Sequence, residues 1–248
     1  KRPRSPRHRE TPDPRDNSCA AACLPIDAGM AFRYLLPLLA VPFLAKAEPV
    51  SLFDGKSLDG WSFDIISEDA KPSDVWSVSD GMIVCKGRPP GVMRTDKEYS
   101  DYELTVEWRW APGKKPGNSG VLVHASKPRE MFVWPKSLEV QLGSGNAGDF
   151  WMIGESVKVE GAKPEGRRWL KKGESAEKEA GEWNTMTVRC EGDTIRVTVN
   201  GTLMNEGKSL STTKGAICLQ SEGAEIHFRK VELTPLGATK EESPEKSR

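Results

Sequence analysis

Two short segments of this chain carry side chains that could do chemistry at strand-like spacing. Residues 117–124 read GNSGVLVH, and residues 137–142 read SLEVQL. Because side chains along a strand alternate between its two faces, Glu139 and Gln141 share one face, and His124 shares a face with the leucine two residues before it. A carboxylate, an amide and an imidazole that face one cleft can bind a polyhydroxylated ligand or move a proton. The alternative is a set of polar residues on the solvated face of an antiparallel sheet.

Strand-like runs that could position these side chains fill most of the chain beyond residue 50. The longest is Tyr102–Trp110, in which apolar and polar residues alternate throughout. The dipeptide Asn200-Gly201 predicts a hairpin, because both residue types tolerate a positive φ. Further hairpins are expected within 75–85 and 186–199. The apolar phase of the last run changes near residues 229–230, which predicts a β-bulge.

The succession of short strands predicts an all-β fold, a β-sandwich or jelly roll. No stretch of useful length has the pattern of an amphipathic helix. Of the five cysteines, Cys19 and Cys23 lie near the N-terminus, and three remain in the strand-rich region. An odd number of widely spaced cysteines favours neither a disulfide framework nor a zinc site, so we expect these three in the core. The expected core includes these cysteines and four tryptophans: Cys85, Cys190, Cys218, Trp61, Trp76, Trp108 and Trp110.

The segment 154–182 differs from the strands around it, since it is rich in Lys, Glu and Gly and has few large apolar residues. Long loops in compact domains are often functional, so we expect a rim or a mobile lid here.

An apolar run, Tyr34–Ala45, precedes the strand-rich region. It follows Met30 and a short basic segment and ends in Ala45-Lys-Ala47, the small-x-small pattern of a signal peptidase site. The run is too short to span a bilayer comfortably. We therefore expect a signal peptide at 30–47, a secreted or periplasmic protein, and no stable membrane span after cleavage. On this interpretation 1–29 is a non-globular leader, 48–236 is the folded domain and 237–248 is a disordered tail.

The charge balance disfavours nucleic acid as a partner. Residues 1–47 contain eight of the 36 basic and four of the 36 acidic residues, so the remainder has a formal net charge of −4. A basic face that could hold phosphates is therefore not expected. The leader itself could be a basic nucleic-acid arm, but its acidic residues offset much of its charge and an exported domain follows it.

An ordered set of motifs resembles the 3-keto-disaccharide hydrolase domain family, which is common in secreted proteins of polysaccharide-degrading bacteria. The resemblance covers about 50–235, and although no single motif is decisive, the ordered set is specific. The motifs are LFDGKSLDGW at 52–61, Trp76 with Asp80-Gly81, YSDYE at 99–103, GNSG at 117–120, EVQ at 139–141, EWN at 182–184, Asn200-Gly201, LQSEG at 219–223 and Phe228-Arg229.

The resemblance implies a concanavalin A-like jelly roll of two curved antiparallel sheets with a sugar cleft on the concave face. It also implies action on glycosides whose 3-hydroxyl is oxidised to a ketone. Such a ketone acidifies the proton on the neighbouring carbon, so a modest base can remove it and the enolate can expel the anomeric substituent. Addition of water to the resulting glycal completes a net hydrolysis. The enzyme then needs a base near that proton and a group that holds the enolate oxygen.

We expect this site to be a cleft with Glu139 as the base. A conventional glycosidase would instead need two carboxylates that straddle the glycosidic bond, for which Glu139 and Asp149 are candidates. The expected catalytic residues are Glu139, His124 and Asp149. The expected substrate-binding residues are Asn118, Arg109, Gln141, Trp151, Trp183, Gln220 and Glu222.

His124 is a departure from the family pattern, because members often carry an arginine at this position. The imidazole is titratable, so it could act as a base or a metal ligand, or oxyanion binding could have moved to Arg109. The change could also mark a non-catalytic relative. His124, Glu139 and Asp149 would make an oxygen and nitrogen ligand set for a divalent metal, although no compact spacing motif supports one.

The sequence therefore predicts an exported enzyme that cleaves 3-keto-glycosides by base-assisted elimination or hydrolysis. The alternatives are a non-catalytic carbohydrate-binding module and an envelope interaction protein, since the same fold serves all three functions.

Overall fold

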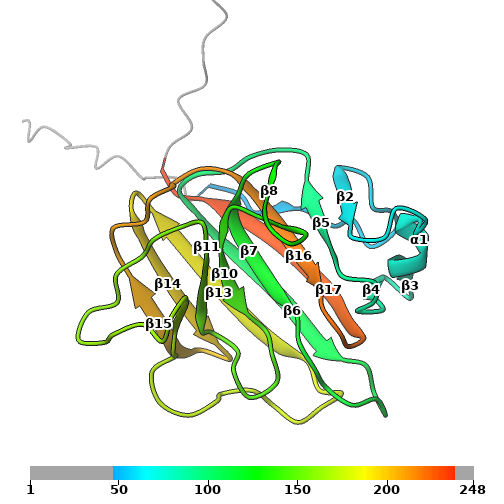
Figure 1. Ribbon diagram of the computed structural model, residues 1–248. Coiled ribbons are helices and arrows are strands. Elements are labelled where there is room, and N and C mark those ends of the chain that lie inside the picture. The colour runs from blue at the N-terminus through cyan, green and yellow to red at the C-terminus, as the bar shows by residue number, and fades with distance from the viewer. Residues whose placement is uncertain (1–46, 238–248) are drawn as a thin grey trace, which may run out of the picture. The chain divides into compact units, whose positions relative to one another are not determined.

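The computed structural model describes residues 47–237, which form a sandwich of two large antiparallel sheets (Figure 1). The first sheet has eight strands, with β1 (Val50–Ser51) paired to β17 at its side. The other strands of this sheet are, in spatial order, β15 (Thr202–Gly207), β14 (Thr194–Val199), β13 (Asn184–Glu191), β6 (Tyr102–Trp110), β17 (Ile226–Pro235), β4 (Met82–Cys85) and β3 (Trp76–Ser79).

The second sheet has seven strands and carries the candidate site. Its strands are, in spatial order, β12 (Arg168–Trp169), β11 (Phe150–Ile153), β10 (Ser137–Gln141), β7 (Gly120–Ala125), β16 (Ala216–Ser221), β5 (Gly91–Thr95) and β2 (Trp61–Ile65). A small hairpin of β8 (Arg129–Met131) and β9 (Trp134–Pro135) lies outside both sheets. The only helix among the described residues is the single turn α1 (Pro72–Val75).

Local sequence patterns place several of these elements correctly. The alternating run at 102–110 is β6, whose odd-numbered polar residues stay partly exposed while the apolar ones are buried. Asn200 and Gly201 have φ of 49° and 81° and join β14 to β15, as the hairpin signal predicts. The bulge expected near 229–230 is a register shift between Phe228 and Lys230.

The main core lies between the two sheets and confirms the expected all-β sandwich. The four tryptophans expected there are at most 7% exposed. The three cysteines within residues 47–237 are buried and free. On the seven-stranded sheet, Val121, Leu138 and Val140 point into this core. Their neighbours along each strand must therefore point to the sheet's outer face, the one turned away from the eight-stranded sheet.

The outer face of the seven-stranded sheet is partly covered by the β8–β9 hairpin. Val133 and Trp134 of this hairpin pack against Leu122 and Cys218 of the sheet, in an apolar cluster separate from the main core. The hairpin therefore covers one part of the outer face, next to Glu139 and Gln141 of β10.

Several expectations fall outside the described residues. These are the leader at 1–29, the signal peptide apart from Ala47, and the tail beyond residue 237. Within 47–237 the structure contains no helix with the length and apolar character needed to cross a membrane.

Candidate functional site

The site is built around Glu139 in the middle of β10. Its backbone pairs with Trp151 of β11 on one side and with Leu122 of β7 on the other. Because Leu138 and Val140 fill the core, Glu139 points to the outer face. A pocket of about 120 Å³ opens there, lined by Asn118, Met131, Trp134, Glu139, Gln141, Trp151, Arg167 and Glu222. We call this the Glu139 pocket.

Gly120 of β7 makes room for the Glu139 carboxyl group. A Cβ atom on Gly120 would lie 2.6 Å from Glu139 Oε1 and 3.0 Å from its carboxyl carbon. The carboxyl group therefore lies over the glycine backbone, next to the side chain of Gln220 on β16. Any larger residue at position 120 would displace it.

The environment of Glu139 favours its protonated form. Burial, followed by the nearby carboxyl of Glu222, raises the pKa of Glu139 to about 8, while Gln220 and Arg167 act in the opposite direction. Glu139 is 6% exposed, and its Oε1 has no hydrogen-bond partner within the described part of the chain. Burial also raises the pKa of Glu222. Two carboxyl groups in one pocket therefore both resist ionisation.

Gln141 is held with its amide in one orientation. Its Oε1 accepts hydrogen bonds from the backbone N–H groups of Leu142 at 2.9 Å and Gly143 at 2.7 Å. The amide nitrogen is thus the group left to face a ligand. Gly143 is required here as well, because a Cβ atom would lie 2.7 Å from Asn118 Oδ1 and 3.2 Å from Gln141 Oε1.

A second pocket adjoins the first and shares Asn118, Gln141 and Trp151 with it. Its volume is about 300 Å³. Its lining is Gly117, Asn118, Gln141, Gly143, Ser144, Asn146, Trp151 and Arg168. We call this the Arg168 pocket.

Asp149 lies beneath the Arg168 pocket and lines neither pocket. Its side chain is completely buried. Its Oδ2 accepts a 2.8 Å hydrogen bond from Nε of Arg168, and its Oδ1 accepts one of 2.7 Å from the backbone N–H of Lys171. The structure thus gives Asp149 the contacts of a residue that positions Arg168.

A bulge in β7 turns His124 away from Glu139. Between two of the residue pairs that join β7 to β16, β7 contains two residues and β16 contains only one. His124 is one of these two residues and has a φ of 53°. The extra residue breaks the alternation. The His124 ring packs edge-on against Tyr102 of the opposite sheet, with ring centroids 5.8 Å apart. The expectation that His124 shares a face with Leu122 is therefore wrong, and the imidazole lies in the interior.

Arg109 and Trp183 lie on the other sheet. Arg109 alternates with the core residues Trp108 and Trp110 of β6, so it points to the outer face of the eight-stranded sheet. There the Trp183 ring is sandwiched between the guanidinium groups of Arg109 and Arg229, each 4.5 Å from its centroid. The structure does not bring this pair to Glu139, because two stacked sheets separate the faces.

Six of the expected residues therefore meet at one place: Asn118, Glu139, Gln141, Trp151, Gln220 and Glu222. His124, Asp149, Arg109 and Trp183 do not join them. Among residues 47–237 no group of three His, Cys, Asp or Glu side chains could hold a metal ion, so the ligand set suggested by His124, Glu139 and Asp149 does not form.

Arg167 is a pocket residue that the sequence did not predict. It comes from the charged segment 154–182, lines the Glu139 pocket and lies over the Trp151 ring at 5.6 Å. The composition of segment 154–182, which predicted a rim or a lid, was the sequence feature that could have indicated this residue. The Met131 and Trp134 walls come from the β8–β9 hairpin, for which the sequence held no comparable signal.

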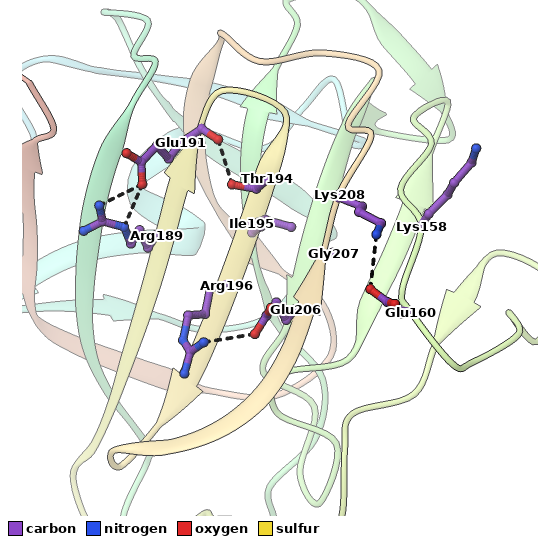
Figure 2. Close-up of a pocket in the computed structure, with 10 residues that line it drawn as sticks. All are labelled: Lys158, Glu160, Arg189, Glu191, Thr194, Ile195, Arg196, Glu206, Gly207 and Lys208. Carbon is purple, nitrogen blue, oxygen red and sulfur yellow. Dashed lines mark hydrogen bonds and ion pairs between the residues drawn. The ribbon is translucent and has the colours of Figure 1, made fainter.

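A larger charged groove of about 400 Å³ lies along β13, β14 and β15 (Figure 2). Its basic residues pair with carboxylates: Arg189 with Glu191 at 2.8 Å, Arg196 with Glu206 at 3.0 Å, and Lys208 with Glu160 at 3.1 Å. None of its charged side chains is buried. Exposed, mutually neutralised ions favour a solvated surface, so the Glu139 pocket is the stronger candidate.

Solved structures with the same fold include carbohydrate-active proteins. Two Parabacteroides distasonis proteins that bear the provisional name glycosyl hydrolase are 22% and 24% identical, with TM-scores of 0.56 and 0.55. Each alignment covers 76% of this chain, and 94% and 100% of the respective relative. A Bacillus licheniformis β-glucanase is 14% identical over 77% of this chain and 99% of its own, with a TM-score of 0.52. These likenesses show the jelly-roll fold.

The sequence comparison gives the family. No curated protein matches the chain. The family model described as 3-keto-alpha-glucoside-1,2-lyase-like domain matches residues 48–234, nearly all of the described structure. This confirms the resemblance drawn from the ordered motifs, and the chain belongs to this family of 3-keto-alpha-glucoside-1,2-lyase-like domains.

Proposed function

We propose that the protein cleaves 3-keto-glycosides by elimination, with Glu139 as the base that removes the proton next to the ketone. The observation that carries this proposal is a buried carboxyl group that lines a pocket, has a pKa raised to about 8 and has one oxygen atom without a hydrogen-bond partner in the described part of the chain. A general base works best when its pKa is near the pH of the reaction. An ordinary carboxylate would be a weaker base for a carbon acid.

The reaction needs two proton transfers and breaks one C–H bond and one C–O bond. The Glu139 carboxylate takes the proton from C2, and the electron pair of that C–H bond forms the enolate of the C3 ketone. The enolate then expels the substituent at C1, which leaves with the C1–O bonding electrons and takes up the proton that Glu139 gained, so that the carboxylate is restored. Water adds to the resulting C1–C2 double bond if the net reaction is hydrolysis.

Arg167 is placed to stabilise the enolate oxygen. It is the only cationic side chain among the described residues that line the Glu139 pocket. A guanidinium group that faces a developing oxyanion in a partly desolvated site lowers the energy of the transition state. Arg167 thus has the oxyanion-binding role for which the sequence suggested Arg109.

The two carboxyl groups fit elimination better than conventional glycoside hydrolysis. A conventional pair keeps one carboxyl ionised and the other protonated, so their environments push the two pKa values apart. Here burial raises the pKa values of both Glu139 and Glu222. We therefore assign Glu139 as the base and Glu222 as a neighbour that raises its basicity and contacts the substrate.

We further propose that the protein works outside the cytoplasm, after cleavage behind Ala47. The support is the sequence pattern of residues 30–47. N-terminal sequencing of the protein recovered from the periplasm or medium of a bacterial host tests this. Mature protein that starts at Glu48 is expected, and a start upstream of Met30 would overturn the proposal.

The activity is tested by incubating the purified protein with a 3-keto-glucoside and analysing the products by mass spectrometry. Glu139→Gln should lower turnover by about a hundredfold or more while retaining ligand, since the amide keeps the shape but cannot accept the proton. Arg196→Ala in the charged groove is the matched control and should leave turnover unchanged. A protein that binds the glycoside with no turnover in the wild type would instead be a carbohydrate-binding module.

A further inference from the structure

We propose that the Arg168 pocket is the subsite for the leaving-group sugar, with Arg168 as its main recognition residue. This inference rests on the proposed function, because it assigns the part of the substrate that is expelled. It names a ligand class for the pocket, a sugar ring or another polyhydroxylated group attached to C1 of the reacting sugar.

The position of the pocket follows from the chemistry. Elimination removes a proton from C2 and a substituent from the adjacent C1, so the leaving group must lie directly beside the base. The Arg168 pocket shares three lining residues with the Glu139 pocket, and its volume of about 300 Å³ exceeds the 120 Å³ of the first. No carboxyl group of the described chain lines it. It is thus suited to binding and not to proton transfer.

Arg168 is immobilised in a way that leaves one edge of its guanidinium free. Its Nε donates to the fully buried Asp149 at 2.8 Å, and its Nη2 donates to Asn146 Oδ1 at 2.9 Å and also to Asp149. Its Nη1 donates to no side chain or carbonyl among residues 47–237. A guanidinium fixed by a buried carboxylate loses little entropy when it binds a ligand.

The pocket presents hydrogen-bond donors, because several of its acceptors are already occupied. Gln141 Oε1 accepts two backbone N–H groups, and Asn146 Oδ1 accepts from Arg168. The Gln141 amide nitrogen and Arg168 Nη1 therefore face the pocket as donors. Sugar hydroxyl and ring oxygens supply the matching lone pairs. Trp151 also lines the pocket, with the Arg168 guanidinium 5.5 Å from its ring centroid.

Two substrates separate this subsite from the catalytic pocket. One is a 3-keto-disaccharide, and the other is the corresponding 3-keto methyl glycoside, which has no second ring. Ser144→Trp fills the Arg168 pocket at an exposed loop position, so the fold should tolerate it. We expect kcat/KM for the disaccharide to fall tenfold or more and that for the methyl glycoside to stay within about twofold. Thr213→Trp, at another exposed loop position outside both pockets, is the matched control.

Arg168→Lys is the second variant, since it keeps the charge opposite buried Asp149 but loses the planar donor edge. It should raise KM for the disaccharide more than it lowers kcat. Variants that slow both substrates equally, or that slow neither, would overturn the inference.

A binding measurement tests the subsite independently of the proposed catalytic activity. If the wild type turns over neither substrate, calorimetric titration of the disaccharide still tests the subsite. Binding to the wild type that Ser144→Trp abolishes supports it, and the absence of binding to the wild type refutes it.

Discussion

Gly120 and Glu139 lie on neighbouring strands, and the space left by the missing glycine side chain is occupied by the glutamate carboxyl group. A Cβ atom at position 120 would approach Oε1 of Glu139 to 2.6 Å, which is shorter than a van der Waals contact. The Glu139 carboxyl group is thus positioned by a residue that contributes no side chain.

Gly120→Ala should therefore lower kcat for the 3-keto-glycoside by tenfold or more. The new methyl group must push the carboxyl away from its place, and misplacement of a catalytic group by about 1 Å can cost about a hundredfold in rate. Steady-state kinetics measure this. Gly207→Ala is the control, because it crowds Val157 far from the site and should reduce stability without changing kcat. Equal effects of both variants on kcat would contradict the assignment of Glu139 as the base.

The rate should depend on pH through Glu139. Since the base must be ionised and its pKa is about 8, kcat/KM should rise about tenfold per pH unit below 8 and level off above it. Glu222→Gln removes the neighbouring carboxyl that helps to raise this pKa, so the midpoint should move to lower pH. A pH–rate profile of both proteins checks this. An unchanged midpoint in Glu222→Gln would show that the two carboxyl groups are not coupled.

Glu139 should also make the protein less stable at alkaline pH. Its pKa is raised from 4.5 to about 8 in the folded state, so the unfolded chain binds fewer protons between these values. The free energy of unfolding should therefore fall as pH rises through this window, in total by a few kcal/mol at about 1.4 kcal/mol per pKa unit. Glu139→Gln should remove the decrease. Urea unfolding at pH 5, 7 and 9 measures it, and parallel curves for both proteins would contradict the burial of an ionisable group.

His124→Phe tests whether the imidazole takes part in catalysis. Because His124 packs against Tyr102 in the interior, we expect kcat to stay within about twofold of the wild type. Burial lowers the pKa of His124, so the unfolded chain takes up its proton first as pH falls below about 6.5 and the wild type loses stability. The variant should lose less stability in acid. A folded variant with a hundredfold lower kcat would restore His124 to the catalytic residues.

Trp183→Ala tests the outer face of the eight-stranded sheet. Removal of the ring between Arg109 and Arg229 should reduce stability by about 1–2 kcal/mol, the scale of two partly exposed cation–π contacts. KM for the 3-keto-glycoside should not change. A thermal melt and a KM measurement on the same preparation separate the two effects, and a raised KM would show that this face binds substrate.

Much of the fold was determined by local sequence patterns. The alternation at 102–110 defines β6, the dipeptide Asn200-Gly201 defines a hairpin, and the change of apolar phase near residue 229 marks the bulge of β17. These features depend on side-chain periodicity and on φ preferences, which act within a few residues. The placement of Glu139 and Gln141 on one face of β10 follows from the same side-chain periodicity.

Only the tertiary structure decided which candidate residues meet. One extra residue in β7 turned His124 into the core, although its own strand pattern put it beside Glu139. Arg167 reached the pocket from a loop with no periodic pattern, whereas Arg109 was carried to the far sheet. Strand alternation assigns a residue to a face only while the register is regular. Sheet pairing, bulges and loop paths determine which side chains meet in one pocket. These features depend on contacts between residues far apart in the chain, so local patterns do not predict them.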